Sequence, residues 1–224
     1  MPSFWLRDED RGVLKGMRWV GPEKADQIAA LMVYIVLVHR ASNEATPGDP
    51  DIGVARITYS GLSDITGLSR AKISGGLKIL RELDAIDVES HGKSNSYRIT
   101  SYKKKSGWAK LPTRGLYSKD GRTIPAFHQF HLRLKVELNA LKLYLLILAL
   151  RNDEMNYAKV SYKRLSERTG VPQTEVRSAI SFLTALGLIH VDKESTDLNA
   201  YSTVNIYRPC HLDRYNHRGT QTSE

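Results

Sequence analysis

"ARITYSGLSDITGLSRAKISGGLKILRELDAIDV" at residues 55–88 and "AKVSYKRLSERTGVPQTEVRSAISFLTALGLIHV" at residues 158–191 are two copies of one pattern. The copies keep step for 34 residues without a gap, and identical residues stand at equivalent places, among them Tyr59/Tyr162, Leu62/Leu165, Ser63/Ser166, Thr66/Thr169 and Gly67/Gly170. A duplicated unit is the simplest explanation, and repeats have to be found before a fold is assigned. The sequence therefore predicts one architecture that is used twice.

The repeat extends on both sides of these stretches. Upstream, "AALMVYIVLVHR" (residues 29–40) matches "NALKLYLLILAL" (residues 139–150). Both read as buried helices and are shorter than the 18 or so apolar residues that a membrane span needs. Downstream, residues 85–100 and 188–207 alternate apolar and polar residues around turn-rich tips, which predicts a β-hairpin in each copy.

Two helices joined by a tight turn lie between these elements. Gly67 and Gly170 stand at the turn, where a left-handed residue is usual. Ser69 is placed to cap the second helix, and Pro172 fits the first turn at the equivalent place. Apolar residues at helical spacing then form one buried stripe in each copy: Ile73, Leu77, Leu80 and Leu83, and Val176, Ile180, Leu183 and Leu186.

The neighbouring glycines Gly75 and Gly76 interrupt this second helix, although each costs about 1 kcal/mol relative to alanine. Gly76 aligns with Ala179 on the inner side, where a small residue lets the preceding helix pack closely. Gly75 aligns with Ser178 and is expected on the outer side, where a missing side chain lets a binding partner approach the backbone. A weak spot tolerated by a well-packed helix is the alternative for Gly75.

Composition limits the class of protein. The 224 residues carry a formal charge of +9 with a pI near 9.6, which favours a polyanionic partner. The single cysteine, Cys210, indicates a reducing compartment, and the early acidic residues do not fit a signal peptide, so a cytoplasmic location is expected. We expect a first domain at residues 1–101, a basic linker at 102–110, a second domain at 111–210 and a disordered tail at 211–224.

The segments "LSDITGLSRAKISGGLKILRELDAIDV" and "LSERTGVPQTEVRSAISFLTALGLIHV" resemble the winged helix-turn-helix superfamily: helix, turn, recognition helix and first wing strand. The resemblance implies an α+β, mainly helical fold of two tandem winged-helix domains, each with a three-helix core and a hairpin wing. "WAKLPTRGLYS" ahead of "LNALKLYLLILALRN" is also similar to the entry segment of winged domains in phage and plasmid replication proteins.

The resemblance also implies which residues contact DNA. Recognition helices enter the major groove with their N-terminal, outward residues. In the first copy these are Ser69, Arg70, Ala71, Lys72, Ser74, Gly75 and Lys78, and in the second Gln173, Thr174, Glu175, Arg177, Ser178 and Ser181. The wings add His91, Lys93, Asn95, Arg98, Lys193, Asn199 and Tyr201 for phosphate or minor-groove contacts, and Lys103 to Lys105 of the linker add backbone contacts. A solvated hairpin and a solvated linker are the alternatives.

No enzyme site is expected. Ser69 and Lys72 match S-x-x-K without its companion motifs, and His128 with His131 lack further metal ligands. We therefore predict no catalytic residue, metal or cofactor. The leading hypothesis is a sequence-specific double-stranded DNA-binding protein that regulates transcription. An origin-binding replication initiator and a protein-interaction adaptor are the alternatives, with the protein itself or the replication or transcription machinery as further partners.

Overall fold

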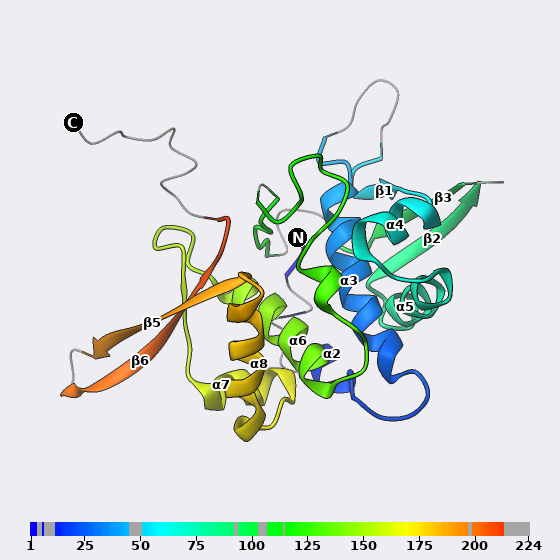
Figure 1. The fold of residues 1–224 in the computed structure, drawn as a ribbon. Coiled ribbons are helices and arrows are strands. Elements are labelled where there is room, and N and C mark those ends of the chain that lie inside the picture. The colour runs from blue at the N-terminus through cyan, green and yellow to red at the C-terminus, as the bar shows by residue number, and fades with distance from the viewer. Residues whose placement is uncertain are drawn as a thin grey trace.

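The computed structural model describes residues 1–3, 6, 12–44, 51–91, 94–102, 107–113, 115–196 and 199–212. One order of elements, helix, strand, two helices and a β-hairpin, occurs twice (Figure 1). The first repeat contains α3 (Lys24–Arg40), β1 (Val54–Arg56), α4 (Tyr59–Thr66), α5 (Arg70–Glu82), β2 (Ile86–His91) and β3 (Ser94–Ile99). The second contains α6 (Lys135–Leu150), β4 (Ala158–Lys159), α7 (Tyr162–Thr169), α8 (Gln173–Ala185), β5 (Ile189–Thr196) and β6 (Asn199–Pro209). The predicted α+β class is confirmed, and so is the predicted order of long helix, two helices and β-hairpin in each repeat.

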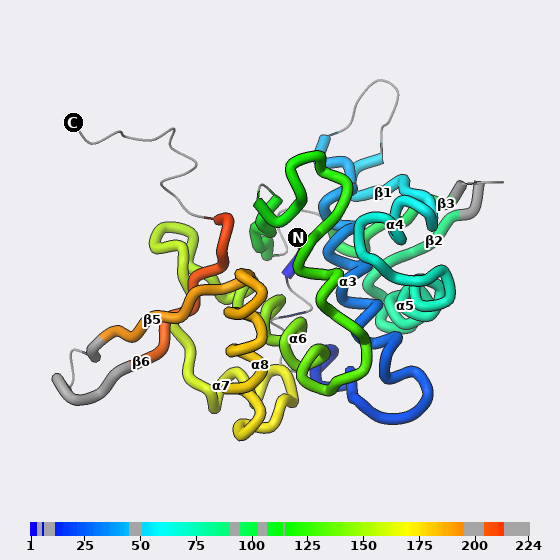
Figure 2. Tube along the Cα trace, in the orientation of Figure 1, coloured from blue at the N-terminus to red at the C-terminus, as the bar shows by residue number. Residues whose placement is uncertain are grey.

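Each repeat ends in a small antiparallel sheet of three strands, in the order β1-β3-β2 and β4-β6-β5. Tyr97 and Tyr207 lie in the middle strands and are fully buried. Tyr97 pairs with Ala55 on one side and Val88 on the other, and Tyr207 pairs with Ala158 and Val191 in the same way. Figure 2 shows the two hairpins at opposite sides of the molecule.

The turn between the paired helices has the predicted geometry. Gly67 and Gly170 both adopt left-handed backbone, with φ of 74° and 68°. The hydroxyl of Ser69 accepts a hydrogen bond from Lys72 N, so Ser69 is the N-cap of α5, as predicted. Pro172 stands one residue before α8 begins.

The two long helices, α3 and α6, pack against each other at the centre of the molecule (Figure 1). Residues 28–38 of α3 and 137–149 of α6 are buried around the whole helix circumference. Helices that are apolar on every side require neighbours on every side. The buried residues of both repeats accordingly form one continuous hydrophobic core.

The segment that precedes each long helix packs on the other repeat. The short helix α2 (Val13–Gly16), ahead of α3, contacts α7 of the second repeat. The segment ahead of α6 contains a 3-10 turn, η2 (Phe127–Gln129), and lies against the first repeat, where Ile124 N donates to Ile65 O at 2.9 Å. The two repeats are therefore joined through both entry segments as well as through α3 and α6.

The described ends of the predicted linker are packed. Tyr102 is buried and its ring meets that of Trp108 edge to face, with 4.9 Å between centroids. Ser3 N donates to Gly107 O at 3.0 Å. Lys103 to Lys105 lie outside the described residues. The predicted disorder does not include residue 212, because Leu212 is buried in the core; residues 213–224 lie outside the described residues.

Lys142 of α6 is a buried cation between the repeats, and its ammonium donates to Met17 O at 3.0 Å. Burial, with the charges of Arg18 and Lys135, lowers the pKa of Lys142 from 10.5 to about 8. Between these pH values the unfolded chain binds more protons than the folded chain, so the stability rises with pH. The free energy of unfolding is expected to rise between pH 8 and pH 9.5, measured by urea denaturation.

The slope from one such group is at most about 1.4 kcal/mol per pH unit. Lys142→Met keeps an unbranched side chain, one atom shorter, and removes the titrating group, so this variant should lose the part of the slope that Lys142 contributes. Burial also raises the pKa of Cys210 above its usual 9.0 and the pKa of Tyr117 and Tyr207 to about 12, and these groups act with the opposite sign. The difference in slope between the two proteins below pH 10 therefore reports Lys142 alone, because both proteins contain these other groups. Equal slopes in both proteins would contradict the assignment.

Candidate nucleic-acid interface

The helix α5 has one buried side and one exposed polar side. Ile73, Leu77 and Leu80 are buried against the core, as their spacing predicts. A guanidinium NH of Arg70 donates to the hydroxyl of Ser60 on α4 at 3.2 Å. The N-terminal part of α5 therefore presents hydroxyls and the guanidinium of Arg70 to solvent. The predicted contact residues that are exposed on this helix and its cap are Ser69, Arg70, Ala71, Ser74 and Lys78.

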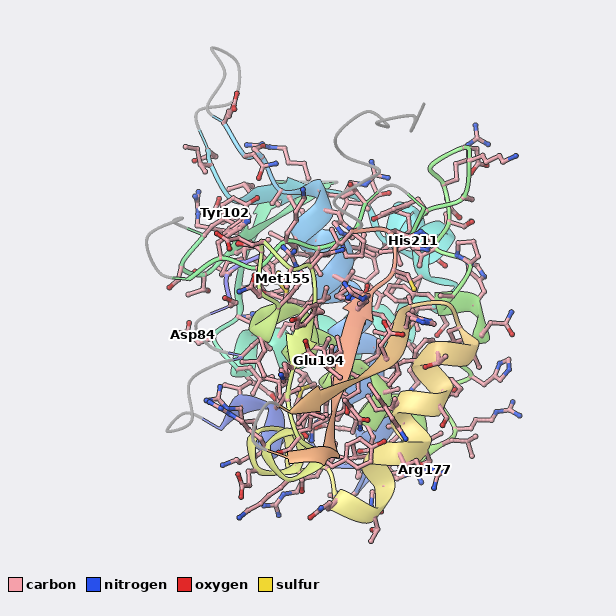
Figure 3. The ribbon with its side chains drawn as sticks, turned by 90° about the vertical axis from the view of Figure 1, so that its left-hand side faces the viewer. Asp84, Tyr102, Met155, Arg177, Glu194 and His211 are labelled. Atoms are coloured by element: carbon pink, nitrogen blue, oxygen red, sulfur yellow. The ribbon has the colours of Figure 1, made fainter. Side chains whose placement is uncertain are left out.

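The helix α8 is divided in the same way. Val176, Ile180 and Leu183 are buried. Five predicted contact residues are exposed: Gln173, Thr174, Arg177, Ser178 and Ser181. Figure 3 shows Arg177 on α8 at the edge of the molecule. We call the exposed residues at the predicted contact positions of α5 and α8 the polar ridges of the two repeats.

Lys72 and Glu175 occupy equivalent positions in the two repeats. Both were predicted to point outward, and the structure shows that this prediction is wrong. Lys72 Nζ lies 2.8 Å from Asp26 Oδ1 of α3. Glu175 accepts hydrogen bonds from Lys135 Nζ and Asn139 Nδ2 of α6, both at 2.7 Å. Both side chains are half-buried against the preceding long helix. The same helix contact is thus made twice with the charges exchanged, and neither residue belongs to a polar ridge.

Gly76 and Gly75 both mark the close approach of α5 to α3. A β-carbon on Gly76 would lie 2.8 Å from Ala30 N and 2.9 Å from the carbonyl carbon of Ala29. The predicted packing role of Gly76 is confirmed. A β-carbon on Gly75 would lie 2.5 Å from Asp26 Cγ, so the expected outward position of Gly75 is wrong. The missing side chain of Gly75 makes room for the carboxylate that binds Lys72.

The cations predicted in the first repeat have acidic neighbours. Lys78 Nζ lies 2.8 Å from Glu23 Oε1, and hydrogen bonding to Glu23 raises the pKa of Lys78. Arg98 lies 3.2 Å from Asp51 and 3.6 Å from Glu89, and hydrogen bonding to Asp51 raises the pKa of Arg98. Arg98 stands at the base of the hairpin, opposite Val54 of β1, so it is remote from the wing tip.

The other wing residues are placed only in part. Asn95 of β3 pairs with Ser90 of β2, and Lys193 is exposed on β5, one residue after Asp192. The side chains of His91, Asn199 and Tyr201, and Lys93 as a whole, lie outside the described residues. The predicted contacts of the wing tips therefore stay predictions.

A group of basic residues that the sequence pattern did not single out lies beside α7. Lys15, Lys163, Arg164 and Arg168 line an open hollow of about 550 Å³ together with Ser161 and Glu167. A comparison of the two repeats could have identified three of them, because α7 ("YKRLSERT") contains three basic residues and α4 ("YSGLSDIT") contains none. Lys15 had no such signal, because it comes from α2 and is separated from α7 by most of the chain.

The described residues contain neither a cluster of metal ligands nor a helix of membrane-spanning character. His128 lies close to the turn at Gly67, where a β-carbon would stand 2.9 Å from its Nδ1 atom. Within the described ranges, no group of three His, Cys, Asp or Glu side chains is placed to hold a metal ion. Within the same ranges, no helix combines the length and apolar character needed to cross a bilayer.

Compared with known proteins, the chain matches no family model, no curated protein and no solved structure.

Proposed function

We propose that this protein binds double-stranded DNA in a sequence-specific manner as a tandem winged-helix protein and regulates transcription. The observation that carries the proposal is the exposed polar ridge, which is present on the second helix of each helix-turn-helix pair. In each repeat a β-hairpin follows that helix directly and is completed by a third strand, in the order β1-β3-β2 and β4-β6-β5, as a wing requires.

The chemistry of the ridges suits base reading in the major groove. Arg70 and Arg177 are donors for guanine, and Gln173 can pair with adenine through its amide. The net charge of +9 favours association with a polyanion such as duplex DNA. Hydroxyl groups that donate or accept hydrogen bonds stand at Ser69, Ser74, Thr174 and Ser181.

Arg177→Ala is expected to weaken binding to the preferred duplex by about tenfold, because a good arginine–guanine pair contributes about 1–3 kcal/mol of discrimination. The loss should be much smaller on a duplex in which the base read by Arg177 is changed. Fluorescence anisotropy with both duplexes measures the two losses. Arg70→Ala should weaken binding to the preferred duplex by a similar factor. Its loss should likewise be much smaller on a duplex in which the base read by Arg70 is changed.

Arg81→Ala is the matched control for Arg70→Ala. Arg81 is also an exposed arginine of α5, but it lies in the last turn of the helix, away from the end that enters the groove. Its replacement should leave the sequence preference unchanged. Equal effects of Arg70→Ala and Arg81→Ala would argue against base reading by α5.

Selection of bound sequences from a random duplex library tests the proposed function directly. Enrichment of a defined motif, bound more tightly than random duplex at two salt concentrations, is the expected result. A library that enriches no motif would contradict sequence-specific binding. A single motif beside a promoter is expected for a transcriptional regulator. Directly repeated motifs, together with recruitment of a helicase by the bound protein, would instead indicate a replication initiator.

A further inference from the structure

The helix that precedes each recognition helix differs in charge between the two repeats. The α4 helix carries no lysine or arginine, whereas α7 carries Lys163, Arg164 and Arg168. The equivalent positions in α4 are Ser60, Gly61 and Ile65. The repeats share their fold but not their electrostatic surface.

The cations of α7 are joined by one from the other end of the chain. The entry segment of the first repeat brings α2 onto α7, where Lys15 Cα lies 3.2 Å from the position of a β-carbon on Gly170. Lys15 and three basic residues of α7 thereby line the 550 Å³ hollow, with Glu167 as its acidic member. We call this surface the basic hollow.

The basic hollow is suited to phosphate groups. Lys15 and Arg164 are exposed, and within the described part of the chain neither forms an ion pair. Lys163 lies 3.9 Å from Glu167, a long exposed pair of little strength. The hollow also includes Ser161 and the first turn of α7, where the helix dipole favours an anion. Arg177 of the second polar ridge is likewise exposed and without an ion pair in the described residues.

The first repeat has cations at its corresponding surface, but acidic groups offset part of their charge. A groove of about 980 Å³ beside α4 is lined by Arg40, Arg56 and Arg122 and also by Asp64 and Asp120. Arg56 lies 3.4 Å from Asp51. On α5, Lys72 and Lys78 are paired with Asp26 and Glu23 at 2.8 Å. Binding of phosphate to Arg56, Lys72 or Lys78 would compete with these ion pairs.

We propose that the basic hollow of the second repeat is the principal phosphate-binding surface and holds the DNA backbone beside the groove read by α8. The inference rests on the proposed function and makes the two repeats unequal. The first repeat contributes few backbone contacts, and its polar ridge adds sequence preference. The amino-terminal segment takes part in DNA binding through Lys15.

The salt dependence of binding tests this inference. A variant with Lys15→Gln, Lys163→Gln and Arg164→Gln should lower the slope of log affinity against log salt by about 0.9 for each lost contact. A fourfold reduction in salt concentration should raise the affinity of both proteins for DNA. If three contacts are lost, the rise for the variant should be about 40-fold smaller than the rise for the wild-type protein. The matched control is Lys110→Gln, Lys119→Gln and Arg122→Gln, which removes the same charge from exposed positions outside the basic hollow.

The control variant is expected to keep the wild-type slope, and circular dichroism melting should show both variants folded. Equal loss of slope in the two variants would mean that only net charge matters, which overturns the inference. If the triple variant that includes Lys15→Gln keeps the wild-type slope while Arg177→Ala still weakens binding, the basic hollow is not the phosphate-binding surface. The proposed DNA binding would then be retained and only this inference rejected. Absence of duplex binding by the wild-type protein overturns both.

Discussion

Glu137→Ala is expected to lower the free energy of unfolding by about 3–5 kcal/mol, because one buried carboxylate holds the start of α6 together. Its Oε1 atom accepts hydrogen bonds from His131 N and Leu132 N at 2.5 and 3.2 Å. Its Oε2 atom accepts from Arg133 N and Leu134 N at 2.8 and 2.9 Å. Glu137 is only 1% exposed, and each amide left without an acceptor costs about 1–3 kcal/mol.

Urea denaturation of three variants checks this expectation. Glu137→Gln retains one acceptor oxygen and should lose roughly half as much stability as Glu137→Ala. Glu82→Ala is the surface control, because Glu82 is exposed and lies 3.8 Å from Lys78. Its replacement should change the stability by less than about 0.5 kcal/mol. Equal stability of Glu137→Ala and Glu82→Ala would show that the four amides are satisfied in another way.

Gly76→Val should destabilise the protein by about 3 kcal/mol, because the added atoms would meet the backbone of α3. The nearest atoms to the new β-carbon are Ala30 N and the carbonyl carbon of Ala29, and neither can rotate away. The two helices would have to separate along a fully buried contact, and overpacking of this kind costs about 1–3 kcal/mol or more. The midpoint of urea denaturation measures the loss.

Gly76→Ala and Gly16→Ala complete this test. Inside a helix, alanine is favoured over glycine by about 1 kcal/mol of helix propensity. Any loss of stability in the Gly76→Ala protein must therefore come from the clash of the new β-carbon with α3. Gly16 ends α2, and a β-carbon on it would have no neighbouring atom within 4 Å, so its replacement should be neutral or slightly stabilising. A more stable Gly76→Ala protein would contradict the close packing of α3 and α5.

Local features of the fold were predictable because they depend on neighbouring residues. The apolar stripe of α5, the cap at Ser69 and the left-handed turn at Gly67 all follow from spacing and residue type. The repeat made the prediction stronger, since a second copy showed the same pattern with different residues. The position of Gly76 against α3 was predictable for the same reason, because Ala179 is its counterpart.

Contacts between distant segments were not predictable. Lys72 looked like an outward residue because its partner, Asp26, stands 46 positions earlier in the chain. Lys15 reaches the basic hollow only because α2 packs on the opposite repeat. Periodicity shows which side of a helix is polar, but it does not show which polar residues meet a partner from another helix.

The crossed entry segments have a consequence for the origin of the chain. A single unit of this design would leave its long apolar helix uncovered, and its stable form would be a symmetric homodimer that exchanges amino-terminal arms. The tandem chain has the arrangement expected of such a dimer after gene duplication and fusion. Fusion removes the constraint that both subunits be identical, which lets one half diverge in surface charge while the shared interior is kept.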